Sequence, residues 1–168
     1  MRWRPPPPKQ SPYITREGYE RLQGELKERW TFRKEVVTAL AAAAAEGDRS
    51  ENAEYAFRKK QLGEIDRRIR YLQKRLPILK VVDPAPSQQR DKVYFGALVT
   101  LEYEDGTVAE HRLVGPDEID TVKRHISIDA PLAKALLGKG VGDEVVLTLP
   151  EGERVYEVVS VCYPDTAA

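Results

Sequence analysis

The stretch "AAAAAEGDRSENAEY", residues 41–55, decides the fold of the first half of the chain. Its alanines continue a helical pattern up to Gly47, a residue type that often follows a helix end, and a second helical pattern begins afterwards. Because the link between the two patterns is short, the two helices must fold back against each other. We therefore expect a finger whose tip, residues 46–51, carries the carboxylates of Asp48 and Glu51.

Two apolar patterns flank this tip, each with the spacing of one helix face. We expect Thr15 to cap the first helix, and Pro77 to end the second near Leu76. The expected seam residues are Tyr19, Leu22, Leu26, Trp30, Val36 or Val37, and Leu40 in the first helix, and Leu62, Ile65, Ile69, Leu72, Leu76 and Leu79 in the second. The second set has a heptad spacing, so we predict an antiparallel coiled-coil hairpin over residues 13–80.

The second half of the chain changes to a strand-like pattern. Prolines and polar residues indicate a linker over residues 81–91. Within residues 92–168, strand-like runs flank the turn at 105–106, a short strand and a short helix follow, and two more strand-like runs complete the pattern. We expect Asp129 to cap the short helix. The prediction is a small α+β domain with a mostly antiparallel sheet.

Charge is divided between the two halves. Residues 1–80 contain 19 lysines and arginines against 11 acids, whereas residues 81–168 contain 8 against 16. The basic half suits nucleic acid or another acidic partner, although long helices also carry such residues on solvated faces. Residues 1–12, "MRWRPPPPKQSP", form a basic, proline-rich arm that lacks the apolar stretch of a secretory signal.

The single cysteine and the absence of long apolar runs bear on location. Cys162 has no partner for an internal disulfide, and no run of about 18 apolar residues is present, so we expect a cytoplasmic protein without a membrane span. We expect Cys162 to be a buried thiol. The two histidines, His111 and His125, are too few and too far apart in sequence to indicate a zinc site.

The tip acids have two interpretations. Asp48 and Glu51 fit a variant of the capping box, in which both acids serve the start of the second helix. Alternatively, two ionised carboxylates at the end of a finger are ligands for a hard cation such as Mg²⁺. Two carboxylates fill only part of an octahedral shell, so this second interpretation needs a partner that supplies the remaining ligands.

Positive charge follows the tip along the second helix. The candidate phosphate-binding residues are Arg58, Lys59, Lys60, Arg67 and Arg68. Tyr55 and Phe57 have the ring faces on which bases stack. The alternative is that the rings pack in the seam and the cations remain solvated.

Several of these motifs together resemble one family. "GDRSENAEY", the following "KK" and "EIDRRIRYL", and the later "FGA", "VGPDEI", "ISIDAPLAKALLGK" and "GDEV" are similar to the GreA/GreB transcript cleavage factors of bacterial RNA polymerase, and "DRSENA" looks most like the GreB branch. The resemblance runs from about Ile14 to Tyr163. Gln61 and Gly63 depart from it, because that branch usually carries cations between "KK" and "EID".

The resemblance implies a mechanism. It implies that an FKBP-like domain docks on the rim of the polymerase secondary channel through Asp129, Ala130 and Pro131. The hairpin then enters the channel, where Asp48 and Glu51 help hold the second Mg²⁺ of the polymerase, which hydrolyses the 3′ end of a backtracked transcript. The factor is then a monomer, shares its Mg²⁺ with the polymerase, contacts nascent RNA, and is not itself an enzyme.

Two other classes of function remain. A protein of the same architecture would occupy the channel without stimulating cleavage, although the retained tip acids and "KK" argue against this. A prolyl isomerase is suggested only by the FKBP-like expectation and needs an aromatic-lined pocket, whereas strand aromatics usually belong to a core.

Overall fold

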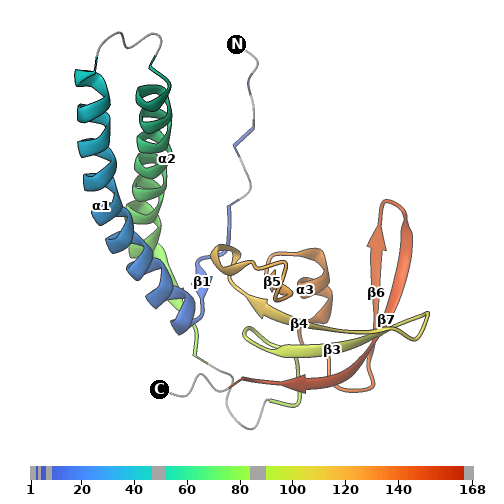
Figure 1. Cartoon of the computed structure of the whole chain (residues 1–168). Coiled ribbons are helices and arrows are strands. Elements are labelled where there is room, and N and C mark those ends of the chain that lie inside the picture. Colours follow the sequence, from blue (N-terminus) through green and yellow to red (C-terminus); the bar gives the residue numbers. More distant parts are fainter. Residues whose placement is uncertain (1–2, 4, 7–8, 47–51, 84–89, 165–168) are drawn as a thin grey trace. The chain divides into compact units, whose positions relative to one another are not determined.

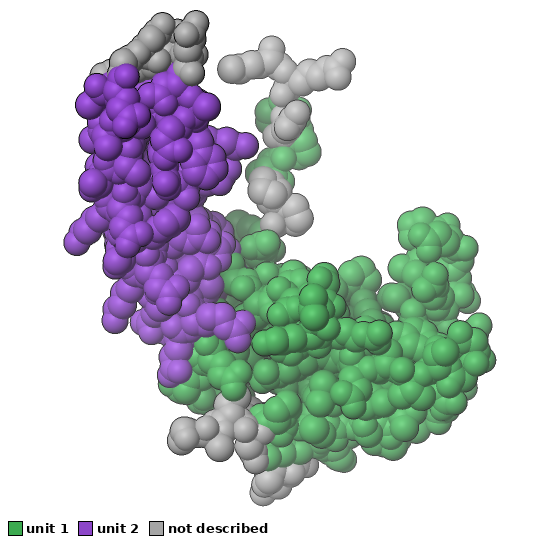
Figure 2. All heavy atoms as spheres, in the orientation of Figure 1, with its two compact units in different colours: residues 1–18, 80–168 green, residues 19–79 purple. Residues whose placement is uncertain are grey.

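A computed structural model describes residues 3, 5–6, 9–46, 52–83 and 90–164. The chain divides into two compact units (Figure 2). One unit comprises residues 19–79, and the other comprises residues 1–18 together with 80–168. The predicted hairpin starts at Tyr13, whereas residues 13–18 group with the C-terminal unit in the structure.

The helical unit contains most of α1 (Arg16–Ala45), all of α2 (Ala53–Arg75) and the 3₁₀ helix η1 (Leu76–Ile78) (Figure 1). Pro77 ends the regular helix as predicted, because η1 starts directly after α2. Later residues of α1 contact earlier residues of α2: Arg33 pairs with Asp66 at 2.7 Å, and Glu25 pairs with Arg68 at 2.7 Å.

The apolar seam of this unit differs from the prediction at one large residue. Val36, Ile65 and Ile69 are buried together, so Val36 rather than Val37 is the seam residue. Trp30 was expected in the seam but is 43% exposed. One heptad before the buried Val36 is Arg29 rather than Trp30, so Trp30 lies beside the seam. The Arg33 guanidinium lies 6.0 Å from the Trp30 ring centroid.

The sheet of the C-terminal unit follows the predicted order of elements. Its strands are β3 (Leu98–Tyr103), β4 (Val108–Val114), β5 (His125–Ser127), β6 (Glu144–Leu149) and β7 (Gly152–Cys162). Within residues 90–164 they form a five-stranded sheet in the order β5-β4-β3-β7-β6, in which only β4 and β5 pair in parallel. Helix α3 (Pro131–Leu136) packs its Ala133 and Leu136 into the same core as the sheet.

A bulge changes which side chains of β7 face the core. The register shifts between Thr100 and Leu101 of β3, which pair with Ser160 and Val158 respectively. Beyond this point the alternation of β7 reverses, so Tyr163 is buried and Cys162 is exposed. The prediction of a buried thiol is therefore wrong, because uninterrupted alternation from Val158 would have turned Cys162 inward.

Two short strands that sequence patterns did not reveal belong to the same unit. β1 (Tyr13–Ile14) pairs in parallel with β2 (Lys80–Val81). The chain segments that precede α1 and follow η1 are thus joined by hydrogen bonds, including one of 2.9 Å from the Val82 amide to the Ile14 carbonyl oxygen.

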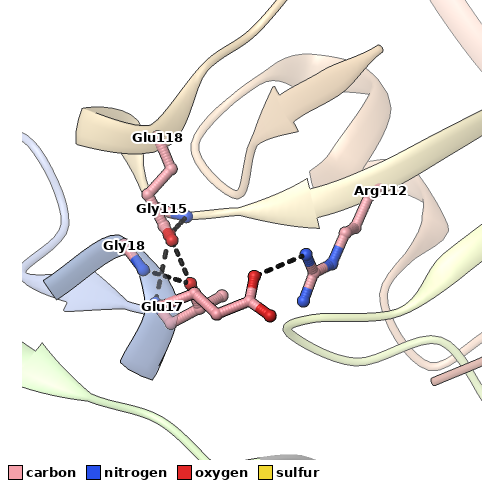
Figure 3. A network of polar contacts seen from close by, with 6 residues as sticks. Glu17, Gly18, Arg112, Gly115 and Glu118 are labelled. Atoms are coloured by element: carbon pink, nitrogen blue, oxygen red, sulfur yellow. Dashed lines mark hydrogen bonds and ion pairs between the residues drawn. The ribbon is translucent and has the colours of Figure 1, made fainter. Parts of the chain in front are cut away.

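A buried carboxylate organises the start of α1 (Figure 3). Glu118, in the 3₁₀ helix η3 (Pro116–Glu118), accepts hydrogen bonds from the amides of Thr15 and Gly115 and from the Thr15 hydroxyl. The same hydroxyl accepts from the Gly18 amide at 3.1 Å, which confirms the predicted cap. Gly18 leaves room for this arrangement, because a Cβ atom there would lie 2.0 Å from a Glu118 oxygen.

Candidate functional site

The predicted tip lies between the two long helices. α1 ends at Ala45 and α2 begins at Ala53. Asp48 and Glu51, the candidate catalytic and metal-binding residues, lie in residues 47–51, outside the described residues, as does Gly47. The structure therefore defines the two helix ends that carry this segment.

Asn52 caps α2 and also connects the two helices. Its Oδ1 accepts a 3.0 Å hydrogen bond from the Tyr55 amide, and its Nδ2 donates a 2.7 Å bond to the carbonyl oxygen of Ala43 in the last turn of α1. The interpretation of Asp48 as the cap of this helix is wrong, because the helix starts four residues later than that box requires. Sequence reasoning passed over Asn52, although asparagine is among the best N-cap residues.

The candidate phosphate-binding cations of α2 fall into two groups. Arg58 and Arg68 are held inside the helical unit: Arg58 bonds to Glu54 at 2.9 Å and to Gln61 at 3.0 Å, and Arg68 makes two bonds to Glu25 at 2.7 and 3.1 Å. A guanidinium in such a pair has fewer donors left for a phosphate.

The second group is open to solvent. Lys59, Lys60 and Arg67 are exposed, and the described residues provide no ion pair for any of them. An ammonium group on a solvated helix face binds phosphate oxygens by charge, with an affinity that falls as salt rises. Of the five candidate cations, these three are therefore the most accessible to a nucleic acid backbone.

The two aromatic residues beside these cations differ in exposure. Phe57 is 56% exposed, and the Arg58 guanidinium lies 5.5 Å from its ring centroid. Tyr55 is half-buried in the first turn of α2. Of the two, Phe57 presents the ring surface on which a base stacks.

The candidate docking residues precede α3. Pro131 is the first residue of that helix and Ala130 is its N-cap, without a side-chain hydrogen bond. Asp129 therefore does not cap the helix as predicted, because it lies one residue too early. Its carboxylate instead accepts hydrogen bonds from the amide of Ser11, at 2.9 Å, and from the Ser11 hydroxyl. No sequence signal connected Ser11 with Asp129, which are 118 residues apart.

A cavity of about 360 Å³ lies next to these residues. Its lining is largely apolar and comprises His111, Ile119, Thr121, Arg124, His125, Ile126, Ser127 and Ala130. Burial, with a smaller contribution from the positive charge of Arg124, lowers the pKa of His111 below its ordinary value, and the Tyr103 hydroxyl lies 3.2 Å from its Nε2. The cavity thus extends the surface of Ala130 with apolar groups and a neutral imidazole.

The described residues contain no group of three or more histidine, cysteine or acidic side chains that would hold a metal ion. A candidate Mg²⁺ site therefore rests on Asp48 and Glu51. Two carboxylates suit Mg²⁺ chemically but leave most of its octahedral shell to other ligands. Among the described helices, none has the length and apolar character needed to cross a membrane.

Comparisons with known proteins identify the family of this chain. Residues 12–81 match the family described as "Transcription elongation factor, N-terminal", and residues 88–163 match "Transcription elongation factor, GreA/GreB, C-term". The chain is 58% identical over 164 residues to a protein of Xanthomonas axonopodis pv. citri named Transcription elongation factor GreB, with 96% of this chain and 97% of that one covered. A protein of the same name from Pseudomonas aeruginosa is 54% identical, with 97% of each chain covered.

A solved structure titled "Prokaryotic transcription elongation factor GreA/GreB from Nitrosomonas europaea" is 26% identical to this chain, with 92% of this chain and 100% of that one covered and a TM-score of 0.40. The two family matches together span both halves of the chain, and the relatives match over nearly its full length. The chain therefore belongs to the GreA/GreB family of transcription elongation factors.

Proposed function

We propose that this protein enters the secondary channel of bacterial RNA polymerase and stimulates Mg²⁺-dependent cleavage of the 3′ end of backtracked transcripts. The observation that carries the proposal is the placement of Asp48 and Glu51 in the short segment between α1 and α2. The Asn52–Ala43 hydrogen bond holds the flanking helix ends together. Family membership supports a role in transcription elongation.

The helical unit serves in this proposal as an antiparallel coiled-coil hairpin that carries the acids. The order of the contacts between α1 and α2 supports this arrangement, since Ala43 bonds to Asn52 whereas Glu25 pairs with Arg68. Lys59, Lys60 and Arg67 attract the phosphates of the extruded RNA, and Phe57 offers a face for one of its bases.

The C-terminal unit serves as an FKBP-like docking domain. Asp129, Ala130 and Pro131 contact the channel rim, and the adjacent apolar cavity extends that surface. Docking places the hairpin at the channel without any requirement for a second copy of the chain, so the factor acts as a monomer in the cytoplasm.

The number of Mg²⁺ ligands that this protein supplies determines which part of the chemistry belongs to it and which to the polymerase. Mg²⁺ bound at the polymerase active site supplies Lewis acidity and lowers the pKa of a bound water. Asp48 and Glu51 contribute anionic oxygens to its shell and orient water by accepting its protons in hydrogen bonds. The factor is therefore not an enzyme, because the bond-breaking centre belongs to the polymerase.

A transcript cleavage assay on a stalled, backtracked polymerase tests this proposal across a Mg²⁺ titration. Asp48→Asn and Glu51→Gln keep the size of each side chain and remove its charge, so we expect stimulation to fall at least about 100-fold at low Mg²⁺ while polymerase binding persists. Glu46→Gln is the matched control, because it removes an exposed acid from the end of α1. Undiminished cleavage with Asp48→Asn contradicts the role in metal binding.

The same assay with the wild-type protein distinguishes stimulation of cleavage from the alternative function, which is occupation of the channel alone. A factor that only occupies the channel binds the polymerase but leaves the rate of cleavage unchanged or lowers it. That result would overturn the proposed stimulation.

A further inference from the structure

The proline-rich arm contacts the docking loop that precedes α3, here defined as residues 127–130. The Ser11 amide donates a 2.9 Å hydrogen bond to Oδ2 of Asp129, and the Ser11 hydroxyl donates to Oδ1. Both residues are half-buried. Both oxygens of the Asp129 carboxylate therefore accept a donor from the arm.

The docking loop keeps its backbone shape through bonds that do not involve the arm. The Asp129 amide donates to the Ser127 hydroxyl at 3.0 Å, and the Ala130 amide donates to the Ser127 carbonyl oxygen at 2.9 Å. The Ile128 amide donates to Val114 of the sheet at 2.7 Å. Ser11 therefore affects how available the Asp129 carboxylate is, rather than the path of the loop.

The chain after Ser11 is fixed to the same unit. The carbonyl oxygen of Pro12 accepts a 2.7 Å bond from the Lys80 amide, and β1 follows at Tyr13. This anchor keeps Ser11 close to Asp129, so its effective concentration at the carboxylate is high. The described residues 9–10, upstream of Ser11, make no backbone–backbone hydrogen bond with another described residue.

We propose that the arm is an autoinhibitory latch, in which Ser11 competes with RNA polymerase for the Asp129 carboxylate. This inference rests on the proposed function, in which Asp129 contacts the polymerase. The arm must release Asp129 before that carboxylate accepts donors from the polymerase in the same directions. Lys9, two residues before Ser11, adds positive charge that favours the return of the arm to the acidic side chain.

The latch has a measurable effect on affinity. When only the open form binds, the apparent dissociation constant equals the intrinsic constant divided by the open fraction. Ser11→Ala removes the hydroxyl bond to a charged group and keeps the amide bond. We expect the variant to bind core RNA polymerase about three- to tenfold more tightly, because charge-assisted hydrogen bonds are among the stronger ones. Ser11→Thr keeps both donors and is expected to bind as the wild type does.

Equilibrium binding of the full-length variants to core RNA polymerase tests the latch, with Asp129→Ala measured alongside. Tighter binding of Ser11→Ala, with Ser11→Thr unchanged and Asp129→Ala weakened, supports it. Equal or weaker binding of Ser11→Ala, with Asp129→Ala weakened, overturns the latch and leaves the docking role intact. Unchanged binding of Asp129→Ala overturns the docking role itself, and the latch with it.

Hydrogen exchange of the Ser11 amide in the free protein tests the contact without polymerase. We expect exchange at this amide to accelerate in Asp129→Ala, because its acceptor is removed, while the amide of Val82, bonded to Ile14 at 2.9 Å, is unaffected. Equal exchange of the Ser11 amide in both proteins contradicts a closed latch.

Discussion

Asn52 donates a 2.7 Å hydrogen bond from its side-chain amide to the carbonyl oxygen of Ala43, and so joins the start of α2 to the end of α1. The same side chain caps α2 through the Tyr55 amide. A single residue thus bonds to an amide in the first turn of one helix and to a carbonyl in the last turn of the other. The two helix ends that flank the tip acids depend on this side chain.

Substitution of Asn52 separates these two contacts. We expect Asn52→Ala to lower the free energy of unfolding by about 1–2 kcal/mol, because it removes the cap and the bond to Ala43. Asn52→Asp keeps the capping oxygen but lacks the Nδ2 donor, so we expect a smaller loss. Urea unfolding followed by helical circular dichroism measures both. Equal stability of Asn52→Ala and the wild type contradicts the role of this residue.

Two glycines of α1 form a matched pair. We expect Gly18→Ala to destabilise the protein by about 1–3 kcal/mol, because the new Cβ lies 2.0 Å from a Glu118 oxygen and disturbs a buried hydrogen-bonded carboxylate. Gly24→Ala has nothing within 4 Å of its new Cβ, so better helix propensity should stabilise the protein by about 0.5–1 kcal/mol. Thermal unfolding compares the two. Shifts of the same sign would contradict this account.

The exposed lysines of α2 provide a test that depends on salt. We expect the double variant Lys59→Ala, Lys60→Ala to bind single-stranded RNA more weakly, with the slope of log affinity against log salt reduced by about 1.4. Lys74→Ala removes an exposed cation from the last turn of the same helix and is the control. An unchanged slope in the double variant excludes these lysines from the RNA contact.

Substitution of Arg68 should affect stability more than RNA affinity, in contrast to substitution of the exposed lysines. Because its guanidinium is paired with Glu25 and lies 5.3 Å from the Tyr71 ring centroid, we expect Arg68→Ala to reduce stability by about 0.5–1 kcal/mol. Its effect on RNA affinity should be smaller than that of Lys59→Ala. Urea unfolding and RNA titration on the same two variants provide the comparison. A larger RNA defect in Arg68→Ala would show that the ion pair opens for RNA.

The lowered pKa of His111 predicts that the folded protein loses stability on acidification. Burial and Arg124 lower its pKa in the folded protein below the ordinary value of 6.5, so the unfolded chain binds this proton more readily. Its contribution is complete above pH 6.5 and is lost as the pH falls toward the folded-state pKa. We expect the stability of His111→Gln to decrease less than that of the wild type in this window. Parallel pH profiles of the urea midpoint would contradict the prediction.

Local sequence patterns predicted the helices and most of the strands, because turns, caps and helix ends each have a characteristic residue pattern. The Asp105-Gly106 turn joins β3 and β4 as expected, with Gly106 at a φ of +85°. Thr15 and Pro77 mark the start of α1 and the end of α2. These signals act within a few residues of the chain, so a single sequence contains them.

Three of the differences from the sequence prediction involve partners far away in the chain. Trp30 lies beside the seam because the position seven residues before the buried Val36 is residue 29, and Val36 is buried against Ile65 and Ile69 of the other helix. Cys162 faces outward because a bulge against β3 reverses the alternation of β7. The Ser11–Asp129 contact links the arm to a loop 118 residues later. Periodicity within one segment contains no information about such pairings.

The parallel pairing of β1 with β2 places residues 13–14 beside residues 80–81. The polypeptide thus leaves the C-terminal unit and returns to it at neighbouring points. Residues 19–79 are therefore an insertion in a domain whose two flanking strands are hydrogen-bonded to each other. We expect that this insertion can be exchanged between relatives while both junctions are preserved. Such chimeras would show whether cleavage properties follow residues 19–79 and docking properties follow the C-terminal unit.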